Sequence, residues 1–170
     1  MKFEIKNPAL FIAKIEQISK FLSHAMVSFY KGKISISGMN SDSILLVSLE
    51  LSEAALAGYK FARTVDYAFN VSAFLNAIKD AKSLKFEFKA GSLTITTDTG
   101  KAIIPTIKFE HSEEQNELDF DSSFDITSYL PLFNECRIKA KAVFPVQLEG
   151  NVGEGMVLKL VVAPNNKHKV

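Results

Sequence analysis

The chain contains very little of the chemistry that most enzyme sites and metal sites require. Cys136 is the only cysteine among 170 residues, and there is no tryptophan. A single cysteine excludes an intramolecular disulfide and a zinc site built from several cysteines, and it favours a reducing compartment. The sequence also has no phosphate-binding glycine loop, no paired histidine ligands and no calcium-loop spacing. It therefore predicts no cofactor and no metal.

Long hydrophobic runs and a strong net charge are also missing. No apolar run approaches the roughly 20 residues of a membrane-spanning helix. The first six residues alternate apolar and charged side chains, which is typical of a strand and not of a signal peptide. The net charge of +1 excludes a strongly basic, histone-like binder of nucleic acid, although charge can still be sorted onto separate faces. These features predict a soluble intracellular protein of the cytoplasm, nucleoid or nucleus, of cellular, viral or mobile-element origin.

What the chain does have is material for a sizeable core. Apolar residues make up 47% of it, and 14 residues are phenylalanine. This composition predicts one ordinary domain, or one and a half small ones, with a core of phenylalanine and aliphatic side chains.

The expected elements follow an order that repeats. A strand at 2–6 precedes a helix that starts at Asn7-Pro8, with asparagine as N-cap and proline in the first turn. The helix carries one apolar stripe formed by Phe11, Ile15, Ile18 and Leu22. Antiparallel strands are expected at 26–30, 34–37 and 44–51.

The same order returns twice along the chain. The second copy has a strand at 67–71, a helix capped by Ser72, and strands at 84–88, 93–97 and 102–107. The third has a strand at 120–126, a helix from Thr127 or Ser128 through Ile138, and strands at 143–150 and 156–162. Units recurring about every 50–65 residues, with helices on one face of antiparallel sheets, predict a modular α+β fold.

Four segments in this order carry a family resemblance. They are the strand at 3–5 with the helix at 8–24, the strand–turn–strand at 34–47, the helix start at 69–78, and the closing strands at 144–148 and 158–164. With these segments the chain resembles the sliding clamps of DNA replication, of the proliferating-cell-nuclear-antigen (PCNA) type. The resemblance implies a DNA-clamp-like α+β fold with three half-units, where the family has four. It implies a complete domain at 1–108, an acidic connector at 109–118, and a partial second domain with a polar tail at 119–170.

The resemblance further implies a surface pocket for a short partner peptide with apolar anchors. A flexible methionine with small apolar side chains suits such a contact, whereas ordinary core and turn packing is the alternative interpretation. An extended partner segment could also pair with the connector at 110–121. The positions that match the family's pocket are Met39, Ile44, Pro145, Val161, Val162, Ala163 and Pro164.

Resemblance to a clamp also implies that the helices face double-stranded DNA. Long cations on such helices contact phosphates without reading bases, whereas an ordinary solvated helix face is the alternative. The basic residues assigned to the three helices are Lys14, Lys20, Lys79, Lys82, Arg137, Lys139 and Lys141.

A catalytic interpretation has little support. Cys136 with His24, His111 or His168 is the only candidate nucleophile and base, and nothing around Cys136 resembles a catalytic motif.

The function implied by the resemblance is therefore a non-catalytic DNA sliding clamp, or polymerase processivity factor. Such a protein holds replication or repair enzymes on DNA, docks partner peptides and forms homo-oligomers. The alternative is a truncated clamp paralogue that acts as an interaction or regulatory protein without encircling DNA. A ring, an open dimer and a monomer all stay open at this point.

Overall fold

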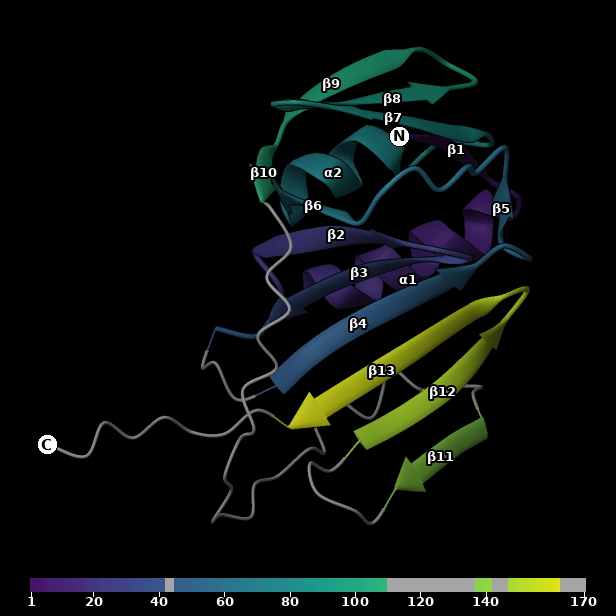
Figure 1. Ribbon diagram of the computed structural model, residues 1–170, viewed down its shortest axis with the longest axis vertical. Helices are drawn as coiled ribbons and strands as arrows, with labels where there is room; N and C mark the ends of the chain where they lie inside the picture. The colour runs from purple at the N-terminus through teal and green to yellow at the C-terminus, as the bar shows by residue number, and fades with distance from the viewer. Residues whose placement is uncertain (42–44, 110–136, 142–146, 163–170) are drawn as a thin grey trace, which may run out of the picture.

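The computed structural model describes residues 1–41, 45–109, 137–141 and 147–162, which form two antiparallel sheets and two helices (Figure 1). The five-stranded sheet has the order β5 (Leu56–Ala57), β1 (Lys2–Ile5), β7 (Leu84–Lys89), β8 (Ser92–Thr97), β9 (Lys101–Pro105). The eight-stranded sheet has the order β10 (Ile107–Phe109), β6 (Val65–Asn70), β2 (His24–Tyr30), β3 (Lys33–Met39), β4 (Leu45–Ser52), β13 (Met156–Val162), β12 (Gln147–Gly153), β11 (Arg137–Lys141).

Each helix begins at an asparagine that caps its first turn. In α1 (Pro8–Ser19), the Asn7 side chain accepts a hydrogen bond from the amide of Leu10 at 3.1 Å, as the Asn-Pro pair predicts. In α2 (Val71–Ile78), the cap is Asn70, which accepts from the amide of Ala73 at 2.9 Å. The prediction of Ser72 as this cap was wrong by two residues. Helix α1 ends at Ser19, short of its predicted end at residue 24.

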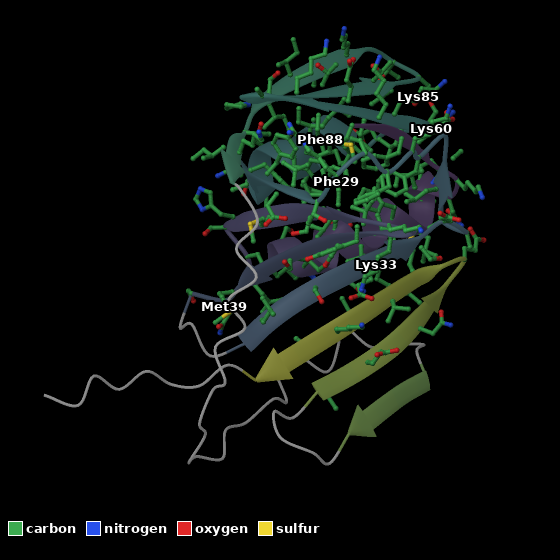
Figure 2. The ribbon with its side chains drawn as sticks, viewed as in Figure 1. Phe29, Lys33, Met39, Lys60, Lys85 and Phe88 are labelled. Atoms are coloured by element: carbon green, nitrogen blue, oxygen red, sulfur yellow. The ribbon has the colours of Figure 1, made fainter. Side chains whose placement is uncertain are left out.

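A cluster of aromatic rings fills the core between the sheets and the helices. The Phe29 ring is fully buried and lies 5.2 Å from Phe88, in an edge-on arrangement (Figure 2). Phe3 lies 5.2 Å from Phe86, and Phe11 of α1 lies 6.3 Å from Phe74 of α2. These contacts join both sheets and both helices, so the core predicted from the phenylalanine content is a single one.

The strand–helix–strands unit appears twice, as β1–α1–β2–β3–β4 and as β6–α2–β7–β8–β9. The α+β fold class is confirmed. Of the third copy, the structure describes β11, β12 and β13. The strand predicted at 120–126 and most of the helix predicted from 127 lie outside the described residues. The helix does not reach Ile138, because 137–141 form strand β11, which pairs with β12.

The last three strands continue the sheet of the first copy. Strands β4 and β13 pair in unbroken antiparallel register from Leu51↔Met156 to Leu45↔Val162. Leu49 and Leu158, which face each other in this seam, are both fully buried. The predicted boundary after residue 108 therefore does not separate two sheets, and β10 runs one residue beyond it, to Phe109. The domain division itself stays a prediction.

A glycine holds the last hairpin against the end of β4. The amide of Ser52 donates to the carbonyl of Gly155 at 2.8 Å. A Cβ at Gly155 would lie 2.5 Å from the Ser52 hydroxyl and 2.8 Å from the Ala55 amide nitrogen, and its φ of +81° is in the left-handed region. Only glycine fits this close approach without strain.

Ion pairs cross the seam on its outer face. The Glu50 carboxylate accepts from the ammonium groups of Lys33 on β3 and Lys159 on β13, each at 3.0 Å. Partial burial raises the pKa of Glu50, but the hydrogen bonds from Lys159 and Lys33 outweigh this effect and hold the pKa below its ordinary value. Glu50 therefore stays ionised at neutral pH and links three strands.

Candidate functional site

An apolar row crosses three neighbouring strands at one end of the eight-stranded sheet. Met39 of β3 is in register with Leu46 of β4, and Leu46 is in register with Val161 of β13. Residues in register on adjacent strands lie on the same face. On β3 and β4 the side chains of Ile36 and Val47 are buried, so alternation along each strand puts Met39 and Leu46 on the outer face.

Met39 is the most accessible member of the row whose side chain the structure describes. It is 41% exposed, while Leu46 is half-buried (Figure 2). Met39 and Val161 are separated by the width of β4, so their backbones lie about 10 Å apart. The family resemblance implies that these two positions belong to one partner pocket. In the structure, Met39 on β3 and Val161 on β13 lie at the same end of one sheet, and Leu46 on β4 lies between them.

Gly38 allows the end of β3 to approach the loop after α1. A Cβ on Gly38 would lie 2.7 Å from the carbonyl oxygen of His24 and 3.0 Å from a methyl group of Leu22. A larger residue would push the strand end, and Met39 with it, away from this loop. The residue before Met39 therefore sets its position.

Beyond the apolar row, the same face carries several polar side chains. The next row of the register contains Ser37, Ser48 and Lys159, and the row after that contains Glu50 with its ion pairs. An apolar strip that borders hydroxyl and ammonium groups can hold an apolar anchor and hydrogen-bond a neighbouring polar group.

The structure describes only one of the other residues predicted for the partner pocket. Val162 is in register with Leu45 at the end of the seam. The remaining predicted pocket residues lie outside the described residues: Ile44, Pro145, Ala163 and Pro164. Sequence reasoning missed Leu46, although its place in the alternation of β4 two residues after Ile44 would have indicated it.

Three of the predicted DNA-facing lysines are exposed and lie at the ends of helices. Lys20 follows the last turn of α1, Lys79 follows that of α2, and Lys82 lies three residues further on. Cations at these positions also interact favourably with the helix dipole, so their placement has a structural reason as well. The backbone amide of Lys82 donates to Asp98 at 2.7 Å, which lowers the pKa of that carboxyl group.

Four members of the predicted set need correction. Lys14 is only 6% exposed, and its ammonium donates to the Gln17 side chain at 3.0 Å, because the residue falls on the buried side of α1. It is not available to a phosphate in this arrangement. Arg137, Lys139 and Lys141 belong to strand β11 and not to a helix.

The charged hollow on the outer face of the five-stranded sheet offers little chemistry. It is lined by Lys2, Glu4, Lys85 and Glu87 beside Ala57-Gly58. Lys2 pairs with Glu87 at 3.2 Å and Lys85 with Glu4 at 3.4 Å. Its charges neutralise one another, so the hollow is not a candidate site.

The described residues contain no group of three or more histidine, cysteine, aspartate or glutamate side chains able to hold a metal ion. His24 is exposed, and its Nδ1 lies 3.2 Å from the Ser23 hydroxyl. Cys136, His111 and His168 lie outside the described residues. Within the described part of the chain, no helix is both long and apolar enough to cross a membrane.

The repeated strand–helix–strands units and their shared sheets define a clamp-like α+β fold. A model of the family described as proliferating cell nuclear antigen, N-terminal domain, matches residues 1–128. The match covers most of the chain, which therefore belongs to the PCNA sliding-clamp family. Among curated proteins, no sequence matches it significantly.

Solved structures of clamps have the same fold. One is the PCNA of A. fulgidus with the C-terminal region of FEN-1 bound, with a TM-score of 0.71, 11% identity, and 99% of this chain and 100% of that chain covered. The PCNA of Entamoeba histolytica has a TM-score of 0.61, 13% identity, and coverage of 96% and 98%. The PCNA2–PCNA3 complex of Sulfolobus tokodaii has a TM-score of 0.60 and 15% identity, and the match covers 93% of this chain and 72% of that chain. At these identities the likeness concerns the fold alone.

Proposed function

We propose that the protein is a non-catalytic sliding clamp that docks partner peptides and holds DNA-acting enzymes near double-stranded DNA inside the cell. The observation that carries the proposal is the seam between β4 and β13. It brings the end of β13 beside the ends of β4 and β3 that carry Leu46 and Met39. Membership of the clamp family agrees with a binding role.

The row of Met39, Leu46 and Val161 is the proposed partner-binding site. Methionine is flexible and polarisable, so it adapts to different apolar anchors. In the neighbouring row, Ser37 on β3 is partly exposed and offers its hydroxyl group to a peptide that lies across the strands, whereas Ser48 is buried. In the A. fulgidus structure the bound partner is the C-terminal region of FEN-1. A peptide of that region is therefore a suitable probe here.

Changing Met39 to aspartate should weaken binding of a fluorescein-labelled FEN-1 C-terminal peptide by about tenfold or more, as expected when a central apolar contact is replaced by a charge. Fluorescence anisotropy measures the dissociation constant. Phe61→Asp is the matched control, because Phe61 is 40% exposed against 41% for Met39. The neighbouring Tyr59 donates to the carbonyl of Tyr30 at 2.7 Å, which puts this loop at the opposite end of β3. Equal weakening by both changes, or by neither, would contradict the proposed site.

For DNA, the proposal rests on the exposed lysines at the helix ends and not on the whole predicted set. The side chains of Lys20, Lys79 and Lys82 are exposed cations. Such side chains can contact phosphate groups without reading the bases. A few phosphate contacts give weak binding that depends on salt and not on sequence. A protein that moves along a duplex needs contacts of this kind.

Replacing Lys20, Lys79 and Lys82 together by glutamine should lower the dependence of DNA affinity on salt. The slope of log K against log salt is negative, and its magnitude should fall by about three, roughly one for each lost phosphate contact. Anisotropy of a short labelled duplex over a salt series gives this slope. The control carries the same loss of charge at three other exposed lysines: Lys31, Lys60 and Lys108. If both variants lose the same slope, binding depends on net charge and not on the helix ends.

The alternative function is a clamp-family interaction protein that does not encircle DNA. The burial of Lys14 and the strand placement of Arg137 favour it, because both reduce the basic helix surface. Retention of the protein on circular but not on linear DNA would support encirclement. Peptide binding without any DNA retention would support the alternative.

A further inference from the structure

An exposed loop with an aromatic ring connects the two sheets. It runs from β5 in the five-stranded sheet to β6 in the eight-stranded sheet, and every residue from Lys60 to Thr64 is exposed (Figure 1). Phe61 in this loop is 40% exposed. Among the phenylalanines whose burial the structure describes, it is the only one in the exposed class, so its ring offers a surface that the core does not use.

Both ends of this loop are fixed to the core. At its start, the Tyr59 hydroxyl donates to the carbonyl of Tyr30 at 2.7 Å, and the Tyr59 ring stacks on Phe29 with 6.4 Å between the centroids. At its end, Val65 is buried and in register with Phe29 on β2. Because the loop is held at both ends, a ligand that binds Phe61 has less conformational freedom to remove than it would in a free segment.

Two cations flank the ring and have no acidic partner. Lys60 precedes Phe61 and Arg63 follows it by two residues, and both cationic side chains are exposed. Lysines on the strands are neutralised, as Lys33 is by the Glu50 carboxylate at 3.0 Å. Within the described residues, no carboxylate forms an ion pair with Lys60 or Arg63. The loop therefore offers two unpaired cations beside one exposed aromatic ring.

We propose that this loop binds single-stranded nucleic acid, with an unpaired base stacked on Phe61 and the neighbouring phosphates paired with Lys60 and Arg63. Stacking uses one free face of a base, which every base has, so the binding does not depend on sequence. Inside a duplex both faces of a base are covered by its neighbours, so the loop selects single strands. It lies at the start of β3, where the Tyr59 hydroxyl is 3.5 Å from the Lys33 carbonyl, and thus at the opposite end of β3 from the Met39 row.

An acidic peptide suits this loop less well than a nucleic acid strand does. Its carboxylates would pair with Lys60 and Arg63, but an apolar anchor on a peptide also needs a pocket that removes it from water. The loop neighbours of Phe61 are charged, small or polar, and Ala62 and Thr64 are themselves exposed, so they do not enclose the ring. A base needs only the face of the ring, which the loop provides.

Fluorescence anisotropy with a labelled oligo(dT) of about 12 nucleotides tests the role of the ring. Phe61→Ala should weaken binding about tenfold, within the range measured for one base stacked on an aromatic side chain. Phe61→Tyr keeps a ring and should retain the affinity. Thr64→Ala is the matched control, because it changes an exposed residue of the same loop without removing a ring or a charge. Equal affinity of the natural chain and Phe61→Ala overturns the proposal.

Further ligands separate stacking from charge. Phe61→Ala should weaken oligo(U) as much as oligo(dT), because stacking does not involve the sugar. The same change should leave the binding of a duplex, of a strand without bases and of a poly-glutamate peptide unaltered, because none of them offers a free base. An equal loss with the strand without bases would mean that Phe61 only positions charges. An equal loss with the peptide would favour an acidic protein partner, and either result overturns the proposal.

A tryptophan at this position reports the stacking directly, because the natural chain has none. Phe61→Trp should retain binding, and its indole fluorescence should fall as oligo(dT) is added, since a stacked base quenches it. Changing Lys60 and Arg63 together to glutamine should reduce the magnitude of the salt slope for oligo(dT) by about 1.4, at roughly 0.7 for each phosphate contact on a single strand. Unchanged indole fluorescence on a bound strand, or an unchanged salt slope, overturns the proposed contacts.

Discussion

Replacing Phe29 with alanine is expected to lower the free energy of unfolding by about 3–5 kcal/mol, as for other fully buried phenylalanines. Phe29 has no exposed surface, and its ring packs between both sheets. It lies 6.1 Å from Phe3, 6.1 Å from Tyr67 and 5.2 Å from Phe88. Removing it leaves a cavity that rings from several different strands cannot readily close. Since a domain is stable by only about 5–15 kcal/mol, the loss is a large share of the total.

The measurement is urea unfolding followed by circular dichroism. Phe61→Ala is the control, because it removes the same ring from a site that is 40% exposed, and we expect its effect to stay within about 0.5 kcal/mol. A loss below about 1 kcal/mol in Phe29→Ala would mean that the aromatic cluster relaxes around the gap and is not the rigid centre of the fold.

The first two copies of the repeated unit could be predicted from sequence because their signals are local. Asn7-Pro8 is a start signal for a helix, and alternation from 84 to 97 marks two strands. Asn70 was missed because Ser72 is an equally good capping residue by type, and only the backbone geometry decides between them.

The wrong predictions concern residues whose burial or secondary structure depends on tertiary contacts. Lys14 follows the helical period onto the buried side of α1, but a lysine in sequence is ordinarily assigned to solvent. Residues 137–141 alternate basic and apolar side chains, which agrees with a strand, yet the neighbouring apolar residues favoured a helix. The strand forms through its pairing with β12, and the local residue pattern does not predict this pairing.

Only part of the candidate site could be predicted, because its residues come together through the pairing of distant strands. Met39 and Val161 were chosen through resemblance to a family and not through spacing, and they are more than a hundred residues apart in sequence. The register of β3, β4 and β13 brings them to one end of one face, and this register also adds Leu46. No residue pattern in one chain predicts which strands become neighbours across such a distance.

The seam between β4 and β13 should be as important for stability as the aromatic cluster. Changing Leu158 to alanine should cost about 2–5 kcal/mol, because the side chain is fully buried opposite Leu49. Val157→Ala is the matched control, since Val157 is only half-buried on the other face of the same strand, and we expect it to cost about 1 kcal/mol or less.

Urea unfolding of the Leu158→Ala variant also tests whether the seam makes one cooperative unit. A continuous sheet and a shared core predict that the whole transition shifts to lower urea, with tyrosine fluorescence and circular dichroism changing together. A first transition that moves while a second stays fixed would show that the last three strands unfold separately. In that case the ends of β4 and β13 would lose their common position before the first copy unfolds, and peptide binding at the Met39 row should disappear with the first transition.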